Sequence, residues 1–170
     1  MKKENVSENT LELAKMGLVA ALYVVLGLLF LPLSFGPLQF RFAEIVNPIA
    51  VFNKRYVWSV TIGCLIVNIF SGNVIDMVVG TANTLVITGG SYLLSRMVKN
   101  YWARLAVVPF VGAISMFMIA FELKFIAAAP FWLTYGQLII SEFVMCTIGV
   151  VIFGIIEKNK SIPDKYKFSN

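Results

Sequence analysis

Long apolar stretches separated by short polar turns dominate the sequence. These stretches cover residues 10–30, 43–52, 57–70, 76–98, 103–127 and 131–156. A helix needs about 20 mainly apolar residues to cross a bilayer, and most of the stretches approach this length. The pattern therefore predicts an all-α integral membrane protein whose fold is a transmembrane bundle of six helices.

Local signals refine this outline at three places. Asn9 followed by Glu12 resembles a capping box and predicts that the first helix starts at Thr10. The loop over residues 31–42 is apolar and aromatic, so we expect it to lie over or within the protein. The helix over residues 43–52 would rise only about 15 Å, which is too little to span alone, and it is expected to lean on that loop.

The positive charges test the six-helix count. With six crossings, both termini and the turns near residues 54 and 99 lie on one side of the membrane. That side holds twelve of the fourteen basic residues: Lys2, Lys3, Lys15, Lys54, Arg55, Arg96, Lys99, Arg104, Lys158, Lys160, Lys165 and Lys167. The other side keeps Arg41 and Lys124. Positive residues collect on the cytoplasmic face, so both termini are predicted to be cytoplasmic in a multi-pass protein of the cell membrane.

This orientation divides the chain into three parts. Residues 1–9 form a cytoplasmic N-terminal segment, residues 10–157 the six-helix membrane domain, and residues 158–170 a polar cytoplasmic tail that we expect to be mobile. The net charge of +5 then reflects topology, together with contact to anionic lipids, and does not indicate a nucleic-acid partner.

Composition narrows the function classes. The chain is 59% hydrophobic and 14% charged, which is more apolar surface than a soluble domain of 170 residues could hide. It has no histidine, and Cys64 and Cys146 lie inside apolar runs as small core residues, so neither a metal nor a cofactor is expected. No nucleotide-binding GxxxxGK[ST] loop is present, so ATP is not expected to bind by that route. No hydrolase motif and no nucleophile or metal set accompanies the acidic residues, so we do not expect an enzyme.

Several polar residues lie in the outer halves of the predicted helices. An ionised group at mid-bilayer costs about 2.5–3.5 kcal/mol, so it usually faces protein and often has a function. The candidates for substrate binding in the helices are Asn68, Asp76, Asn83, Glu122 and Glu142. Each also has a structural interpretation. Asp76 could cap a helix, Asn68 and Asn83 could join two helices by a hydrogen bond, Glu122 could reach the membrane interface, and Glu142 could pair with a buried cation.

The loop before the short helix adds a second group of candidates. Gln39, Arg41 and Glu44 lie among the aromatic residues Phe35, Phe40 and Phe42. Carboxylate, carboxamide and aromatic groups together suit a flat heterocycle that forms hydrogen bonds, although Arg41 and Glu44 could instead form a surface ion pair. Trp132 and Tyr135 either belong to an interfacial aromatic belt or add to a stacking wall.

Small residues form a stripe on the inner half of the first helix. Ala14, Gly17 and Ala21 follow one another at helical spacing. Such stripes allow another helix to pack closely. The partner is either another helix of this bundle or a separate subunit.

One segment carries a specific family resemblance. The run Pro32–Glu44, with the sequence PLSFGPLQFRFAE, resembles the first loop of the QueT family, the substrate-binding (S) components of energy-coupling factor (ECF) transporters assigned to queuosine precursors. The segments 63–71, 76–81 and 141–142 support the resemblance, which extends from about Ala14 to Gly154.

The resemblance implies a bacterial six-helix S component with a pocket on the outer side. It would capture a 7-deazaguanine base such as 7-aminomethyl-7-deazaguanine or queuine. It would dock through the first helix onto a membrane coupling subunit (EcfT) driven by two cytoplasmic ATPase subunits, as an importer of the ABC class.

The residues suggest how such a base would be held. Guanine-like edges present N–H donors, which carboxylates accept as charge-assisted hydrogen bonds. We expect the donor edge at Glu44 or Glu142, the carbonyl edge at Gln39, Asn68 or Asn83, an aminomethyl cation at Asp76 or Glu122, and stacking on Phe35, Phe40 or Trp132. The alternatives are an S component for another vitamin or nucleobase, a self-sufficient secondary transporter, and a membrane enzyme.

Overall fold

Helices account for all regular structure in the part of the chain that the structure describes. The computed structural model describes residues 2–34, 40–70, 72–161, 163–164 and 167–168, with side chains from residue 9 onward. Its helices are α1 (Lys2–Leu29), α2 (Leu31–Ser34), η1 (Phe42–Val51), α3 (Lys54–Ile69), α4 (Val74–Ser95), α5 (Tyr101–Ile126) and α6 (Phe131–Lys158). The prediction of an all-α protein is confirmed for these residues.

Four stretches are long and apolar enough to cross a membrane: Asn9–Leu29, Val74–Ser95, Tyr101–Ile126 and Phe131–Lys158. The 16 residues of α3 and the 10 of η1 rise about 24 Å and about 20 Å, less than a hydrocarbon core of about 30 Å. A multi-pass membrane protein is therefore supported, whereas the count of six crossings stays a prediction.

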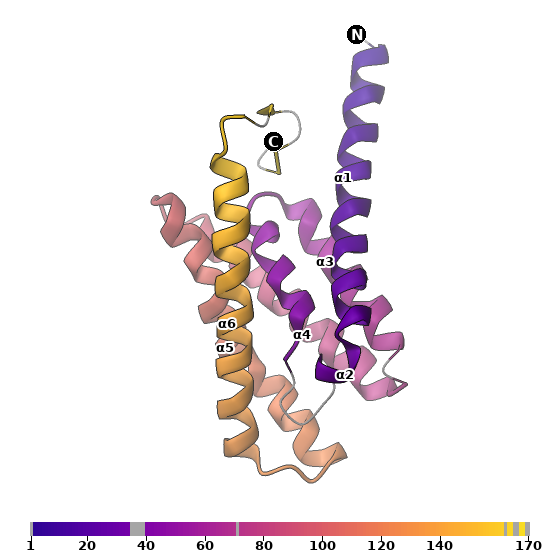
Figure 1. Ribbon diagram of the computed structural model, residues 1–170, viewed down its shortest axis with the longest axis vertical. Coiled ribbons are helices and arrows are strands. Elements are labelled where there is room, and N and C mark those ends of the chain that lie inside the picture. The colour runs from indigo at the N-terminus through magenta and orange to yellow at the C-terminus, as the bar shows by residue number, and fades with distance from the viewer. Residues whose placement is uncertain (1, 35–39, 71, 162, 165–166, 169–170) are drawn as a thin grey trace.

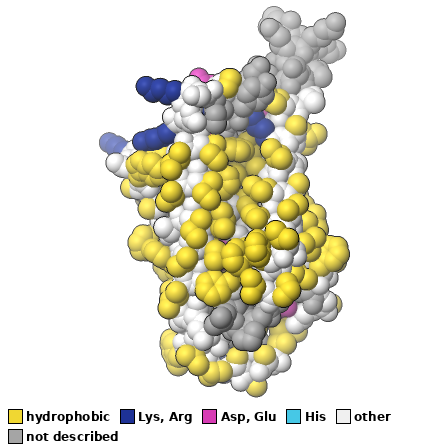
Figure 2. All heavy atoms as spheres, in the orientation of Figure 1, with side chains coloured by type: hydrophobic (Ala, Val, Ile, Leu, Met, Phe, Trp, Pro, Cys, Tyr) yellow, Lys and Arg dark blue, Asp and Glu magenta, His cyan; other side chains and the backbone are white. Residues whose placement is uncertain are grey.

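The surface has the polarity of a membrane protein. Figure 2 shows hydrophobic side chains over the middle of the molecule and Lys and Arg side chains gathered at one end. The start of α1 and the end of α6 lie at that same end (Figure 1). We call it the basic end, defined by Lys54, Arg55, Arg96, Arg104 and Lys158. The sidedness of the molecule in the membrane stays a prediction.

The short helix η1 lies at the centre of the bundle. It contacts α1, α3, α4, α5 and α6, and eight of its ten residues are buried. The expected α-helix over residues 43–52 is a 3₁₀-helix instead. Pro48 within it has no N–H to donate, and 3₁₀ winding extends ten residues over about 20 Å where an α-helix would extend about 15 Å.

Helix starts differ from the prediction where capping was inferred. α1 continues through Asn9 to Lys2, so the predicted start at Thr10 is wrong. Asn73 caps α4 by accepting a hydrogen bond from the Ile75 N–H at 2.9 Å. Asp76 therefore lies in the first turn of α4. It does not cap the helix, which was one of the two interpretations of this residue.

The end of the chain folds back against the bundle. The Phe168 ring packs edge-on against Tyr56 at 5.6 Å and Phe153 at 6.2 Å. The backbone N–H of Phe168 donates to Glu157 at 3.0 Å, and Lys15 on α1 donates to the carbonyl oxygen of Lys167 at 2.8 Å. Residues 167–168 of the predicted mobile tail therefore pack against the bundle, with the Phe168 ring in an apolar site beside α3 and α6.

The closest approach at a glycine lies between η1 and α6. A Cβ added at Gly149 would overlap the carbonyl oxygen and carbon of Ile45, both backbone atoms that cannot turn aside. Gly136 on the same helix has nothing within 4 Å of such a Cβ. Gly149 thus permits α6 to touch the central helix directly.

We expect Gly149→Ala to destabilise the protein by about 1–3 kcal/mol, because the added methyl group forces α6 away from η1. Gly136→Ala is the matched control, and alanine's better helix propensity should leave its stability equal or higher. Thermal unfolding of the purified protein in detergent measures both. Equal midpoints for the two variants would contradict the close packing.

Candidate functional site

A small polar cavity lies at the end of the bundle opposite the basic end. Its walls are Ser34, Arg41, Asn68, Asp76, Gly80, Ile119, Glu122 and Leu123, and its volume is about 20 Å³. These residues come from α2, α3, α4, α5 and the segment before η1. Four of the predicted substrate-binding residues therefore meet in space, namely Arg41, Asn68, Asp76 and Glu122.

Charge is the main property of this cavity. The guanidinium of Arg41 shares its walls with the carboxylates of Asp76 and Glu122. Glu122 is only 6% exposed. Among the described residues, Nη1 of Arg41 and Oε1 of Glu122 are buried without a hydrogen-bond partner. Buried polar atoms are normally paired, so within the part of the chain that the structure describes these two atoms keep unused hydrogen-bonding capacity.

Gly80 keeps the cavity open between α3 and α4. A Cβ at this position would lie 2.7 Å from Nδ2 of Asn68 and 3.4 Å from Nη2 of Arg41. The same Asn68 nitrogen lies 3.4 Å from the Thr81 hydroxyl oxygen and 3.3 Å from the Cys64 sulfur. Asn68 thus joins α3 to α4 as well as lining the cavity, so its two interpretations are compatible.

Glu44 lies behind the cavity and has its own partners. It is fully buried, and its carboxylate accepts hydrogen bonds from the Tyr23 hydroxyl at 3.0 Å and from the Asn47 amide. Nε of Arg41 lies 3.6 Å from the same carboxylate. Arg41 and Glu44 therefore form a buried ion pair, and Glu44 holds the arginine that faces the cavity.

Two further predicted residues lie in the interior. Glu142 is 2% exposed and accepts a hydrogen bond from the Cys146 thiol at 3.2 Å. Asn83 is fully buried, and neither polar atom of its side chain has a partner among the described residues; the same holds for Oδ1 of Asn47. Hydrogen-bonding capacity is thus left unused on α4 and η1.

The remaining predicted residues lie elsewhere. Phe35 and Gln39 are outside the described residues. Trp132 is 78% exposed with its ring against Phe131, and Tyr135 packs against the same ring and donates to the Ile114 carbonyl at 3.4 Å. The structure places both on the surface of α5 and α6 and away from the walls of this cavity.

Five contributors were not among the predicted site residues. Tyr23 holds Glu44 from the second half of α1, and the cavity is also lined by Ser34, Gly80, Ile119 and Leu123. The only signal for Tyr23 is a hydroxyl within an apolar stretch, on the same helix face as buried Val19.

These features define a multi-pass membrane protein with a small, carboxylate-lined cavity at one end of a helical bundle. The chain belongs to the QueT family: the family model described as QueT transporter matches residues 13–158. It is 41% identical over 158 residues to the queuosine precursor transporter QueT of Lactococcus lactis subsp. cremoris (strain MG1363), covering 88% of this chain and 94% of that protein. No solved structure was found to match the chain. The resemblance seen in the first loop is thus confirmed.

We expect Glu44→Ala to destabilise the protein by about 3–5 kcal/mol, because it leaves the Arg41 guanidinium and the Tyr23 hydroxyl buried without their partner. Tyr23→Phe removes one hydrogen bond and should cost about 0.5–1.5 kcal/mol. The free energy of unfolding, measured by denaturant titration in detergent, ranks the two variants. A Glu44→Ala protein as stable as Tyr23→Phe would show that Glu44 has no such supporting role.

Proposed function

We propose that this protein is the S component of an ECF-type importer and that it captures a 7-deazaguanine precursor of queuosine. The observation that carries the proposal is a set of buried polar atoms at and near the cavity, on Arg41, Glu122 and Asn83, that have no hydrogen-bond partner among the described residues. Membership of the QueT family supports transport as the function, and the printed name of the relative supports this substrate class.

The cavity chemistry suits the polar edges of such a base. A guanine-like edge offers N–H donors that Glu122 can accept and a carbonyl oxygen to which Arg41 can donate. One arginine faces Asp76 and Glu122 in the cavity and Glu44 behind it. This excess of acidic groups favours a ligand that carries a cation, such as the aminomethyl group of 7-aminomethyl-7-deazaguanine.

This geometry revises the roles suggested for the carboxylates. Asp76 and Glu122 line the cavity, whereas Glu44 is saturated by Tyr23 and Asn47. We therefore propose direct ligand contact for Asp76 and Glu122, with Asn68 beside them. Glu44 acts by positioning Arg41, and Glu142 and Asn83 lie deeper as contacts for a ligand that reaches further in.

The size of the cavity adds a condition to the proposal. A volume of about 20 Å³ suffices for a single water molecule. A purine-sized base enters only if wall side chains move apart, so the described conformation is a closed one. The walls that can separate are the ends of α3, α4 and α5, because η1 is packed on all sides.

The small-residue stripe supports docking to a separate subunit. Ala14, Gly17 and Ala21 are exposed on α1, and nothing lies within 4 Å of a Cβ added at Gly17. The stripe therefore faces outward from the bundle. We propose that a membrane coupling subunit (EcfT), with two ATPase subunits, packs here, that both termini face the cytoplasm of a bacterial cell, and that the chain crosses the plasma membrane six times.

We expect Asp76→Asn and Glu122→Gln each to weaken binding of 7-aminomethyl-7-deazaguanine about tenfold or more, because each removes a charge-assisted hydrogen bond. The loss should be smaller for 7-deazaguanine, which lacks the aminomethyl cation. Isothermal titration of the purified protein measures both bases. Lys124→Gln, an exposed residue two positions from Glu122, is the control and should bind as wild type. Wild-type affinity in both carboxylate variants would refute this site.

We expect Gly17→Leu to abolish ATP-dependent uptake while leaving base binding intact, because the new side chain blocks close helix approach without touching the bundle. Gly136→Leu on α6 makes the same change at another uncrowded glycine and should transport normally. Uptake and copurification with the coupling subunits are the readouts. Normal complex formation by Gly17→Leu would argue against the α1 interface, and uptake without any ATPase would argue for a secondary transporter.

A further inference from the structure

A second and much larger cavity lies at the basic end of the molecule. Its volume is about 490 Å³. It is bounded by the end of η1, the turn after α4, the first turn of α5, the end of α6 and the chain end. It plays no part in the proposed base site, which lies at the opposite end of the bundle.

The polar wall of this cavity contains basic groups with unused hydrogen-bonding capacity. Arg96, Arg104 and Lys167 line it together with Glu157 and Asp164. Lys167 pairs with Asp164 at 2.7 Å, and Glu157 accepts from the backbone N–H of Phe168. Nε of Arg104 is buried without a hydrogen-bond partner among the described residues. The two arginines therefore remain as donors for an anion.

Two contacts with Tyr92 hold the Arg96 side chain in a position to contact an anion. Arg96 donates from Nη2 to the Tyr92 hydroxyl at 2.6 Å, and its guanidinium lies 4.7 Å from the centre of the same ring. Only part of its donor set is used there, since a guanidinium has five N–H groups. A tethered guanidinium with free donors suits the oxygens of a phosphate group.

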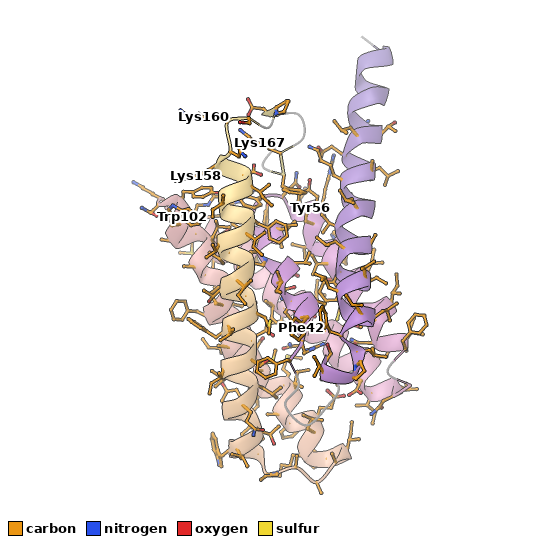
Figure 3. All side chains as sticks on the ribbon, in the orientation of Figure 1. Phe42, Tyr56, Trp102, Lys158, Lys160 and Lys167 are labelled. Atoms are coloured by element: carbon orange, nitrogen blue, oxygen red, sulfur yellow. The ribbon has the colours of Figure 1, made fainter. Side chains whose placement is uncertain are left out.

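The surroundings of the cavity are those of a membrane interface. Trp102 is 41% exposed at the start of α5, and Lys158 lies 5.2 Å from its ring; both lie at the basic end (Figure 3). Aromatic rings and lysines at helix ends mark the headgroup level of a bilayer. Leu93, about one helical turn before Arg96, and Met97, which follows Arg96, are 67% and 82% exposed, which offers an apolar path for acyl chains.

We infer that this cavity binds the phosphate headgroup of an anionic phospholipid, with Arg96 and Arg104 as its donors. A soluble phosphate compound would use the same arginines. The lipid is favoured because Val51, Phe52 and Leu105 form an apolar wall and because exposed apolar side chains adjoin the polar one. The lipid would join the turn after α4 to the start of α5, and hence two spanning helices.

The test is native mass spectrometry of the full chain in detergent. The added compounds are dioleoylphosphatidylglycerol, dioleoylphosphatidylcholine, glycerol 3-phosphate and inorganic phosphate. We expect phosphatidylglycerol to bind most tightly, and Arg96→Gln and Arg104→Gln each to weaken it about fivefold. Lys99→Gln removes the same charge from the same end outside the cavity walls, and it should change affinity less than about twofold because exposed charges are screened.

Each outcome supports or overturns the inference. Equal losses in Lys99→Gln and the two arginine variants would show diffuse attraction and overturn the site. Binding of glycerol 3-phosphate or inorganic phosphate as tight as that of the lipid would overturn the lipid assignment. Arg96 is exposed, so Arg96→Gln should fold even if Arg104→Gln does not. Arg104→Lys, which retains the charge, should recover part of the affinity. Helical circular dichroism confirms folding.

Discussion

The buried carboxylate of Glu44 is the interaction on which the rest of the structure depends. A charge in the interior of a membrane protein is tolerated only with close partners, and here Tyr23 of α1, Asn47 of η1 and Arg41 supply them. The backbone carbonyl of Glu44 also lies 3.7 Å from the Cys146 sulfur of α6. One residue thus ties the central helix to two spanning helices and aims Arg41 at the cavity.

The length of η1 explains why a cavity exists at that place. A 3₁₀-helix of ten residues covers about 20 Å, so η1 is shorter than the candidate spanning helices around it. The ends of α3, α4 and α5 line the cavity, and Arg41, which also lines it, directly precedes η1. Gly80 prevents α4 from closing the space with a side chain. The site is therefore a consequence of one short central helix among longer ones.

The sequence predicts some of these features well because they follow from local properties. Apolar length locates most helices, and the cost of a charge in lipid singles out Asp76 and Glu122 as residues that face protein. It does not predict the 3₁₀ winding of η1, which depends on packing against five helices at once. It also leaves two interpretations of Trp132 open, because an aromatic residue near a helix end suits a lipid-facing belt as well as a binding site; the side chain is 78% exposed.

The charged residues at the two ends of the molecule carry two kinds of information: their number on each side predicts topology, and their positions in space indicate which of them line a cavity. The positive residues predict topology by their number on each side, and such a count does not depend on their positions in space. The structure separates them: Arg96 and Arg104 line a cavity, whereas Lys99 is exposed outside it. The structure also distinguishes the acidic residues. Glu44 accepts hydrogen bonds from its neighbours, whereas one carboxylate oxygen of Glu122 has no partner among the described residues. Because the Glu44 network and Gly149 hold η1 against α1 and α6, the proposed opening of the cavity beside Arg41 would come from α3, α4 and α5. A headgroup bound between α4 and α5 at the basic end would then act on the two helices whose far ends carry Asp76 and Glu122.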